Sequence, residues 1–156
     1  MNISARAVAL HVIYERVPFL NLTAGVLMES ISVAQLWAGR VLSGIAVVFL
    51  FVDAMGKLFK VTPVVEGTVK LGYPEGVVFP LGVLLLAGVV LYAIPKTSAL
   101  GAIYLTAFLG GAVATHIRVG SPLATHVLFG VYVAAFVWGG LALRNPRLLA
   151  LLTGGH

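Results

Sequence analysis

Three long apolar segments without a single charged residue dominate this sequence. Residues 76–95 read GVVFPLGVLLLAGVVLYAIP, and residues 97–115 and 127–143 are equally free of charge. A helix needs about 20 mostly apolar residues to cross the hydrocarbon core of a bilayer. The whole chain contains 60% hydrophobic and only 10% charged residues, whereas soluble domains carry roughly 25% charged residues. We therefore predict an integral membrane protein.

A fourth span is predicted before these three, although charges lie closer to its centre. Arg40 and Asp53 are 13 residues apart, which is roughly 20 Å along a helix axis. The hydrocarbon core is about 30 Å thick, so a span over residues 34–58 places at least one of these charges in the apolar zone. Lys57 follows Asp53 by four residues, on the same helix face. We predict that Asp53 and Lys57 form an ion pair.

The four predicted spans cover about residues 34–58, 76–95, 97–117 and 122–143. Short connectors with proline and glycine join the last three, so neighbouring helices are expected to run antiparallel. The sequence thus predicts an all-α membrane protein, an antiparallel four-transmembrane-helix bundle with both termini on one side. That side carries five or six Lys and Arg residues and the other carries four, which favours cytoplasmic termini.

The net charge of +5 does not indicate nucleic-acid binding. The basic residues lie at the edges of apolar segments, where cationic side chains meet the headgroups of the lipid bilayer. The chain has no cysteine, which excludes disulfide exchange, thiolate metal sites and cysteine nucleophiles.

Two segments lie outside the predicted spans. Residues 1–27 form an N-terminal extension, which is either an interfacial helix or the result of a natural start at Met28; the sequence leaves both open. The four-span unit then covers residues 28–156. Between the first two spans, residues 59–75 are expected to form a short hairpin or an amphipathic turn over the mouth of the bundle.

A row of small residues marks one face of the third predicted span. Its members follow one another at a spacing of four and are Ala102, Thr106, Gly110 and Ala114. Small residues let helices approach closely in lipid, so we predict that this row packs against a neighbouring helix. Arg118 continues the row and is expected to point at the bundle.

Five ionisable residues are predicted to gather at one membrane face, because the first and third spans end there and the fourth begins there. They are Asp53, Lys57, His116, Arg118 and His126. Ionisable side chains in membrane helices usually face the bundle interior or a water-filled cavity. The layer is therefore either a ligand-binding polar pocket or a set of interfacial anchors with one structural ion pair.

The two histidines permit two kinds of chemistry. Each ends an Ala-Thr-His tripeptide, at residues 114–116 and 124–126. A histidine can exchange protons near neutral pH, and we favour that role over ligation; the alternative is that both histidines are interface residues that cap their own helix ends. Ligation of haem or a metal is not favoured, because haem ligands usually lie deeper in a helical bundle.

Several short motifs in this order resemble the DoxX-like family of small four-span bacterial membrane proteins. The motifs are LWAGR at 36–40, DAMGKL at 53–58, LGYP at 71–74, GGAVATHIR at 110–118 and LRNPR at 143–147. The family takes its name from a membrane subunit of a thiosulfate:quinone oxidoreductase. The resemblance implies a location in the bacterial cytoplasmic (inner) membrane and an association with redox-complex subunits. It assigns no catalytic residues, and it does not extend to the segment before Met28.

Two classes of function remain open. In the first, the protein is a subunit of a quinone-linked redox complex that binds a quinone or a small oxyanion at the polar layer. Lys57 and Arg118 would be the cation donors and His116 a proton acceptor, while a partner carries the electron-transferring cofactor. In the second, it is a non-enzymatic small-molecule carrier, with a homo-oligomer supplying the pathway, or a structural membrane subunit.

Overall fold

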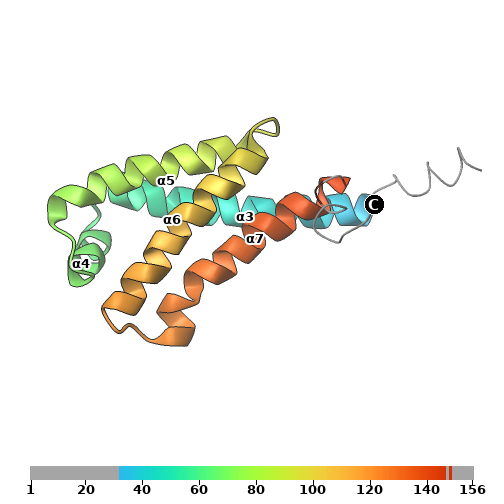
Figure 1. Cartoon of the computed structure of the whole chain (residues 1–156). Helices are drawn as coiled ribbons and strands as arrows, with labels where there is room; N and C mark the ends of the chain where they lie inside the picture. Colours follow the sequence, from blue (N-terminus) through green and yellow to red (C-terminus); the bar gives the residue numbers. More distant parts are fainter. Residues whose placement is uncertain (1–31, 147, 149–156) are drawn as a thin grey trace, which may run out of the picture. The chain divides into compact units, whose positions relative to one another are not determined.

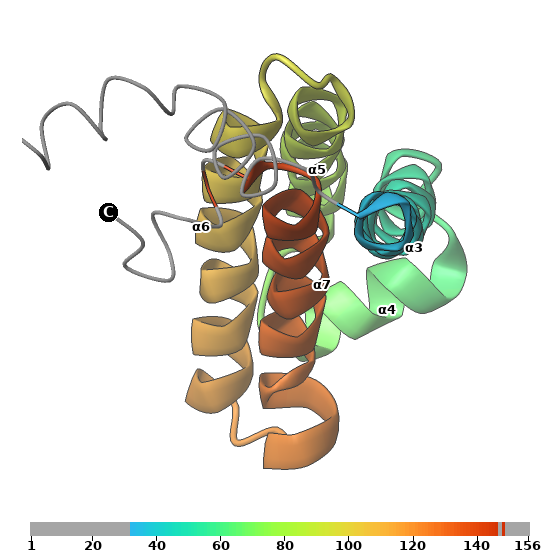
Figure 2. The ribbon, with the colours of Figure 1, turned by 90° about the vertical axis from the view of Figure 1, so that its right-hand side faces the viewer.

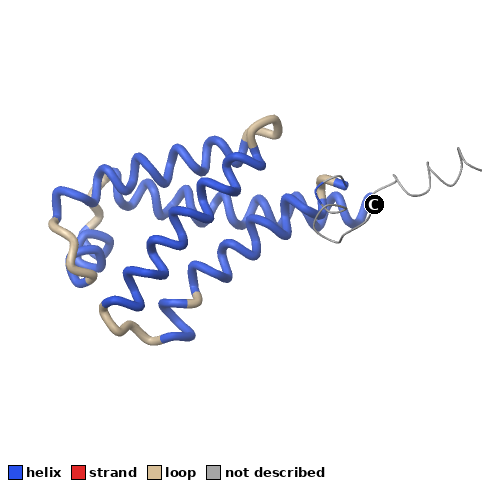
Figure 3. Tube along the Cα trace, in the orientation of Figure 1, coloured by secondary structure: helices blue, strands red, loops and turns tan. Residues whose placement is uncertain are grey.

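The computed structural model describes residues 32–146 and residue 148. Nearly all of them belong to the second of two compact units of the chain, Val33–His156. The predicted boundary at residues 27 and 28 lies outside the described residues. Every regular element in the described part is helical, as Figure 3 shows.

Four helical segments are long and apolar enough to cross a membrane. The first is α3 (Val33–Leu58) and the third is α6 (Ser98–Arg118). The second joins the short helix η1 (Glu75–Val77) to α5 (Val78–Ala93), and the fourth joins the π-helix η2 (Leu123–Val127) to α7 (Phe129–Leu143). The bounds agree with the predicted spans to within two residues at each end. The predicted all-α membrane fold is thus confirmed.

The four helices pack in a closed order (Figures 1 and 2). α3 packs against α5 and α7, and α6 packs against the same two helices from the other side. Their interior holds a continuous apolar core that includes Leu50, Leu85, Leu105, Val137 and Leu141. Because consecutive spans are antiparallel, α3 and α6 end at one end of the bundle. We call this the α4 end and the opposite one the Arg144 end.

Glycines set the closest helix contacts. A Cβ atom added to Gly101 of α6 would lie 2.5 Å from the Tyr92 Cα of α5, and one added to Gly140 of α7 would lie 2.7 Å from the Ser43 nitrogen of α3. A Cβ atom on Gly82 of α5 would lie 2.9 Å from the Cβ atom of Lys57. These helix backbones therefore approach one another at positions where a side chain would not fit.

The predicted packing row on the third span meets its neighbours only in its first half. The Thr106 hydroxyl accepts from the Trp138 indole nitrogen of α7 at 2.8 Å. Ala102 is fully buried, but Thr106, Gly110 and Ala114 are exposed. No atom of another helix lies within 4 Å of a Cβ atom placed on Gly110. A spacing of four identifies residues that share a face, but it does not determine which face meets a neighbour. The close contact of α6 with α5 instead falls on Gly101, one residue away from the row.

The connector between the first two spans contains a helix where a hairpin or turn was expected. It is α4 (Thr62–Lys70), with a proline in its first turn. α4 packs on α3, because a Cβ atom on Gly56 would already lie 3.1 Å from Val64 Cγ2. Positive φ angles at Lys60 (49°) and Gly72 (87°) turn the chain before and after the helix. The expected cover over the bundle mouth is therefore present as a helix of nine residues.

Candidate functional site

A cavity of about 830 Å³ lies at the α4 end of the bundle. Residues of α3, α4, α5, α6, η2 and α7 line it. Figure 1 shows α4 beside the left-hand end of α3. The lining residues Pro63 and Thr68 place the cavity next to this helix. The apolar wall of the cavity includes three phenylalanines and two leucines: Phe49, Phe108, Phe129, Leu50 and Leu109.

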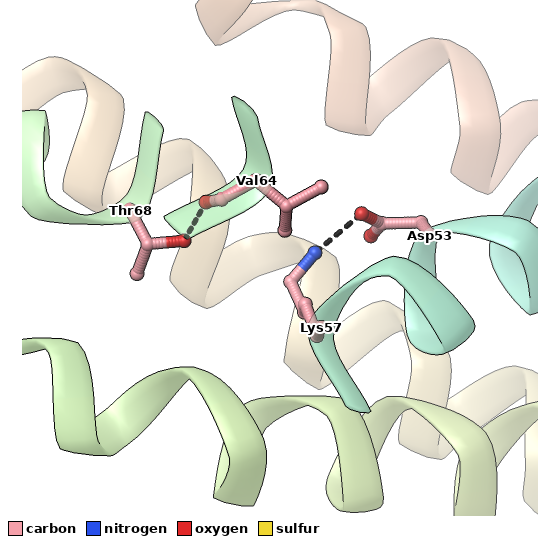
Figure 4. A network of polar contacts seen from close by, with 4 residues as sticks. All are labelled: Asp53, Lys57, Val64 and Thr68. Atoms are coloured by element: carbon pink, nitrogen blue, oxygen red, sulfur yellow. Dashed lines mark hydrogen bonds and ion pairs between the residues drawn. The ribbon is translucent and has the colours of Figure 1, made fainter. Parts of the chain in front are cut away.

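Asp53 and Lys57 form the predicted ion pair on the cavity wall (Figure 4). The Lys57 side chain is only 14% exposed, and that of Asp53 is 34% exposed. The stem of Lys57 packs against α5, where Gly82 leaves room for it. Figure 4 also shows the Lys57 amine beside the α4 segment that contains Val64. The amine is thus held between α3 and α4 at the edge of the cavity.

His116 and His126 also line the cavity, although they come from different helical segments. Their ring centroids lie 5.6 Å apart. His116 Nδ1 is 3.0 Å from the hydroxyl of Ser121, and His126 Nδ1 is 2.8 Å from that of Thr125. Each ring is therefore oriented through Nδ1 by a neighbouring hydroxyl, and its Nε2 atom has no hydrogen-bond partner among the described residues.

A hydroxyl chain fixes another part of the wall. The Thr115 hydroxyl donates to the Gly111 carbonyl at 2.9 Å, so its oxygen can accept from the Tyr73 hydroxyl, which lies 2.9 Å away. This bond links the connector before η1 to α6. Thr115, Tyr73 and Ser121 line the cavity together with the ionisable residues.

These three hydroxyl residues were missed by the sequence reasoning, which considered only ionisable groups. Two signals could have found them. Thr115 belongs to the first Ala-Thr-His tripeptide, and Tyr73 belongs to the LGYP motif. Ser121 follows His116 by five residues and lies in the short connector that separates the two histidines.

Arg118 is the one member of the predicted polar layer that does not line the cavity. Its side chain is exposed, and Nη2 donates to the Leu71 carbonyl at 2.7 Å. The expectation that Arg118 points at the bundle is therefore wrong. The structure brings Asp53, Lys57, His116 and His126 to one cavity, while Arg118 holds the connector between α4 and η1.

The described residues contain no group of three or more His, Asp or Glu side chains that could hold a metal ion. The cavity combines apolar walls, an ion pair, two imidazoles and four hydroxyl-bearing residues, the fourth being Thr68 of α4. Such a lining can bind a small organic molecule with a polar head and an apolar body.

The four apolar spans and the cavity at one end define a multi-pass membrane protein. The sequence matches the DoxX-like family over residues 41–140. The chain therefore belongs to the DoxX-like family. Comparisons with curated proteins and with solved structures found no match.

Proposed function

We propose that this protein is a membrane subunit of a quinone-linked redox complex and that its cavity binds the quinone head. The observation that carries the proposal is that one cavity is lined both by Lys57, His116 and His126 and by the phenylalanines Phe49, Phe108 and Phe129. A quinone head offers carbonyl oxygens as hydrogen-bond acceptors and a flat apolar ring. Membership of the DoxX-like family supports the proposed association with a redox complex.

The charge of the lining favours a quinone over a small oxyanion. Asp53 neutralises Lys57 within the cavity wall, and Lys70 is the other cation that contributes to the lining. A desolvated oxyanion needs more unpaired positive charge than this. A neutral head needs only N–H and O–H donors, and a lysine ammonium keeps two of its three donors when one carboxylate oxygen is bound.

The size and position of the cavity also suit a lipid-soluble molecule. Its volume of about 830 Å³ lies in the range of roughly 300–1,000 Å³ that is typical of small-molecule sites. Phe49 and Phe129 line the cavity, and their rings contact each other edge to face at 5.4 Å. These two residues are 43% and 45% exposed, which in a membrane means exposed to lipid. An apolar tail could therefore leave the cavity between α3 and α7.

Each residue has a distinct part in this proposal. Lys57 donates a hydrogen bond to a carbonyl oxygen of the head, and Asp53 holds the ammonium in place through the ion pair. His116, oriented by Ser121, exchanges a proton with the ligand or with water. A bound quinone supplies the capacity to accept two electrons and two protons, and a partner protein carries the cofactor that delivers the electrons.

Binding of decylubiquinone to the protein in lipid nanodiscs tests the proposal. The variant Asp53→Asn/Lys57→Met removes the pair without leaving a lone carboxylate, and we expect it to bind about tenfold more weakly, the effect of one charge-assisted hydrogen bond. Lys60→Met is the matched control, because Lys60 is exposed and outside the cavity lining. Equal affinity of wild type and double variant, or no saturable binding to the wild type, would overturn the quinone site.

Purification from native membranes tests the redox association separately. We expect an oxidoreductase subunit with a bound redox cofactor to co-purify, together with quinone. Recovery of the protein alone, with solute flux through its proteoliposomes, would place it among carriers instead.

A further inference from the structure

The Arg144 end of the bundle contains a half-buried arginine that has two buried nitrogens and no counter-ion among the described residues. Arg144 follows the last residue of α7, and its Nε and Nη2 atoms are both buried with no hydrogen-bond partner in the part of the chain that the structure describes. These two nitrogens carry three of the five N–H donors of the guanidinium. A donor that is buried away from water without an acceptor costs free energy.

Charged partners for Arg144 do not exist among the described residues at this end. The chain has five acidic residues, and the three that the structure describes are Asp53, Glu66 and Glu75. Asp53 is paired with Lys57 near the α4 end. Glu66 lies on α4 and Glu75 begins η1, at that same end of the bundle. The described residues therefore supply no anion for Arg144.

Buried side chains of the bundle fix the position of the Arg144 guanidinium. The guanidinium carbon lies 5.2 Å from the centroid of the Tyr92 ring, and Tyr92 is only 1% exposed. The Tyr92 hydroxyl donates to the Val137 carbonyl at 2.7 Å and lies 3.0 Å from the Ser43 hydroxyl. Three helices thus hold the ring on which the guanidinium rests, and the cation is positioned before any ligand binds.

The free atoms of Arg144 define the shape of the missing acceptor. Nε and Nη2 lie on one edge of the guanidinium, and their N–H bonds are parallel, which matches two oxygens of one anionic group. The side chain as a whole is half-buried, so part of the guanidinium lies at the bundle surface, while the covered Nε–Nη2 edge has to open before an anion can reach it. Arg40 and Trp37 of α3 lie in the half of that helix next to this end, with the Arg40 guanidinium 5.5 Å from the Trp37 ring. Arginine and tryptophan are typical of the headgroup level of a bilayer.

We propose that the Nε–Nη2 edge of Arg144 binds a phosphate group, supplied in the membrane by the headgroup of an anionic phospholipid. Two phosphate oxygens accept the two parallel hydrogen bonds, and the negative charge compensates the half-buried cation. This site lies at the opposite end of the bundle from the cavity and does not depend on the proposed quinone.

Lipid retention in native mass spectrometry tests this site. The delipidated protein is titrated with phosphatidylglycerol, with phosphatidylcholine and with inorganic phosphate. We expect wild type to bind phosphatidylglycerol most tightly, and Arg144→Lys to bind it about tenfold more weakly because lysine lacks the two-donor edge. Arg40→Lys is the matched control, since Arg40 is an exposed arginine on an aromatic ring in the same half of α3.

Equal losses of phosphatidylglycerol affinity in the two lysine variants would show that general surface charge causes the binding, and would overturn the proposal. Binding of inorganic phosphate with no preference for the lipid would support a phosphate site at Arg144 and contradict the lipid headgroup as the source of the phosphate.

A measurement on the unmodified protein covers the case in which Arg144→Lys does not fold. In bilayers of phosphatidylglycerol, solid-state NMR should detect dipolar coupling between lipid ³¹P and the ¹⁵N atoms of the Arg144 side chain. Coupling to a carboxyl ¹³C without ³¹P coupling would instead assign the edge to a carboxylate of the chain itself, and would overturn the proposal.

Discussion

At the scale of single residues, hydroxyl groups provide many of the polar contacts between helices. Thr106 and Thr115 each donate to the carbonyl four residues earlier in α6. Their oxygens are then free to accept, and they lie 2.8 Å from the Trp138 indole nitrogen and 2.9 Å from the Tyr73 hydroxyl. A threonine on a membrane helix can therefore satisfy its own donor within the helix and still bind a neighbouring element.

Tyr92 allows a test of such a bond in the core. Tyr92→Phe removes the hydroxyl between Ser43 and the Val137 carbonyl. We expect a loss of about 1 kcal/mol in the free energy of unfolding, because polar contacts between membrane helices contribute modestly. Unfolding in SDS titrations measures it, and Tyr132→Phe is the control because Tyr132 is 47% exposed. An equal effect of both substitutions would contradict a structural role for the buried hydroxyl.

The Asp53–Lys57 pair leads to a second prediction at this scale. Lys57→Met should destabilise the bundle more than Asp53→Asn/Lys57→Met does, because the single substitution leaves a partly buried carboxylate without its partner. A double-mutant cycle of unfolding free energies should give a coupling of about 1 kcal/mol. A coupling near zero would mean that the pair contributes nothing to folding and that the two charges are kept for another purpose.

At the scale of helices, the two glycines of α6 that differ most in their surroundings give the sharpest prediction. Gly101→Ala places a Cβ atom 2.5 Å from the Tyr92 Cα, and overpacking of this kind costs typically about 1–3 kcal/mol. Gly110→Ala meets no atom within 4 Å, so it should be neutral or stabilise by up to about 1 kcal/mol through helix propensity. Thermal unfolding of the two variants in one detergent measures the difference. A destabilising Gly110→Ala would indicate that another copy of the chain covers this face.

The sequence predicts the length of each helix, but it does not predict which helix face contacts a neighbour. The length and hydropathy of each apolar segment determine its span, which is why the bounds agree so closely. Which helix face meets a neighbour depends on the packing of all four helices, and the regular row at 102–114 does not contain that information. Gly101 lies outside the row, and only the structure reveals its contact with α5.

The candidate site was predictable to the extent that topology places residues at one end of the bundle. Asp53, Lys57, His116 and His126 line one cavity because the ends of α3 and α6 and the start of η2 meet there. The position of Arg118 was not predictable, since it depends on the path of the connector at Leu71. The helix α4, which completes the cavity, was expected only as a turn, because residues 59–75 mix apolar and charged residues over a short stretch.

At the scale of the whole molecule, the orientation in the membrane decides from which side a redox partner can reach the cavity. The α4 end carries four cations in the sequence, and Lys57 is paired with Asp53. Lys60, Lys70 and Arg118 remain there, whereas the sequence predicts five or six Lys and Arg residues on the side of the termini. The excess favours cytoplasmic termini, so we expect the cavity to lie near the non-cytoplasmic face.

Cysteine labelling tests this orientation directly, because the chain contains no cysteine of its own. Glu66→Cys on α4 and Lys96→Cys in the connector between α5 and α6 change exposed residues at opposite ends of the bundle. In intact cells, a membrane-impermeant maleimide should label Glu66→Cys at once and Lys96→Cys only after the membrane is permeabilised. The reverse pattern would place the cavity at the cytoplasmic face and require a cytoplasmic redox partner. Labelling of both positions from the same side would contradict the crossing of the membrane by α5 itself, and with it the four-span arrangement on which the cavity depends.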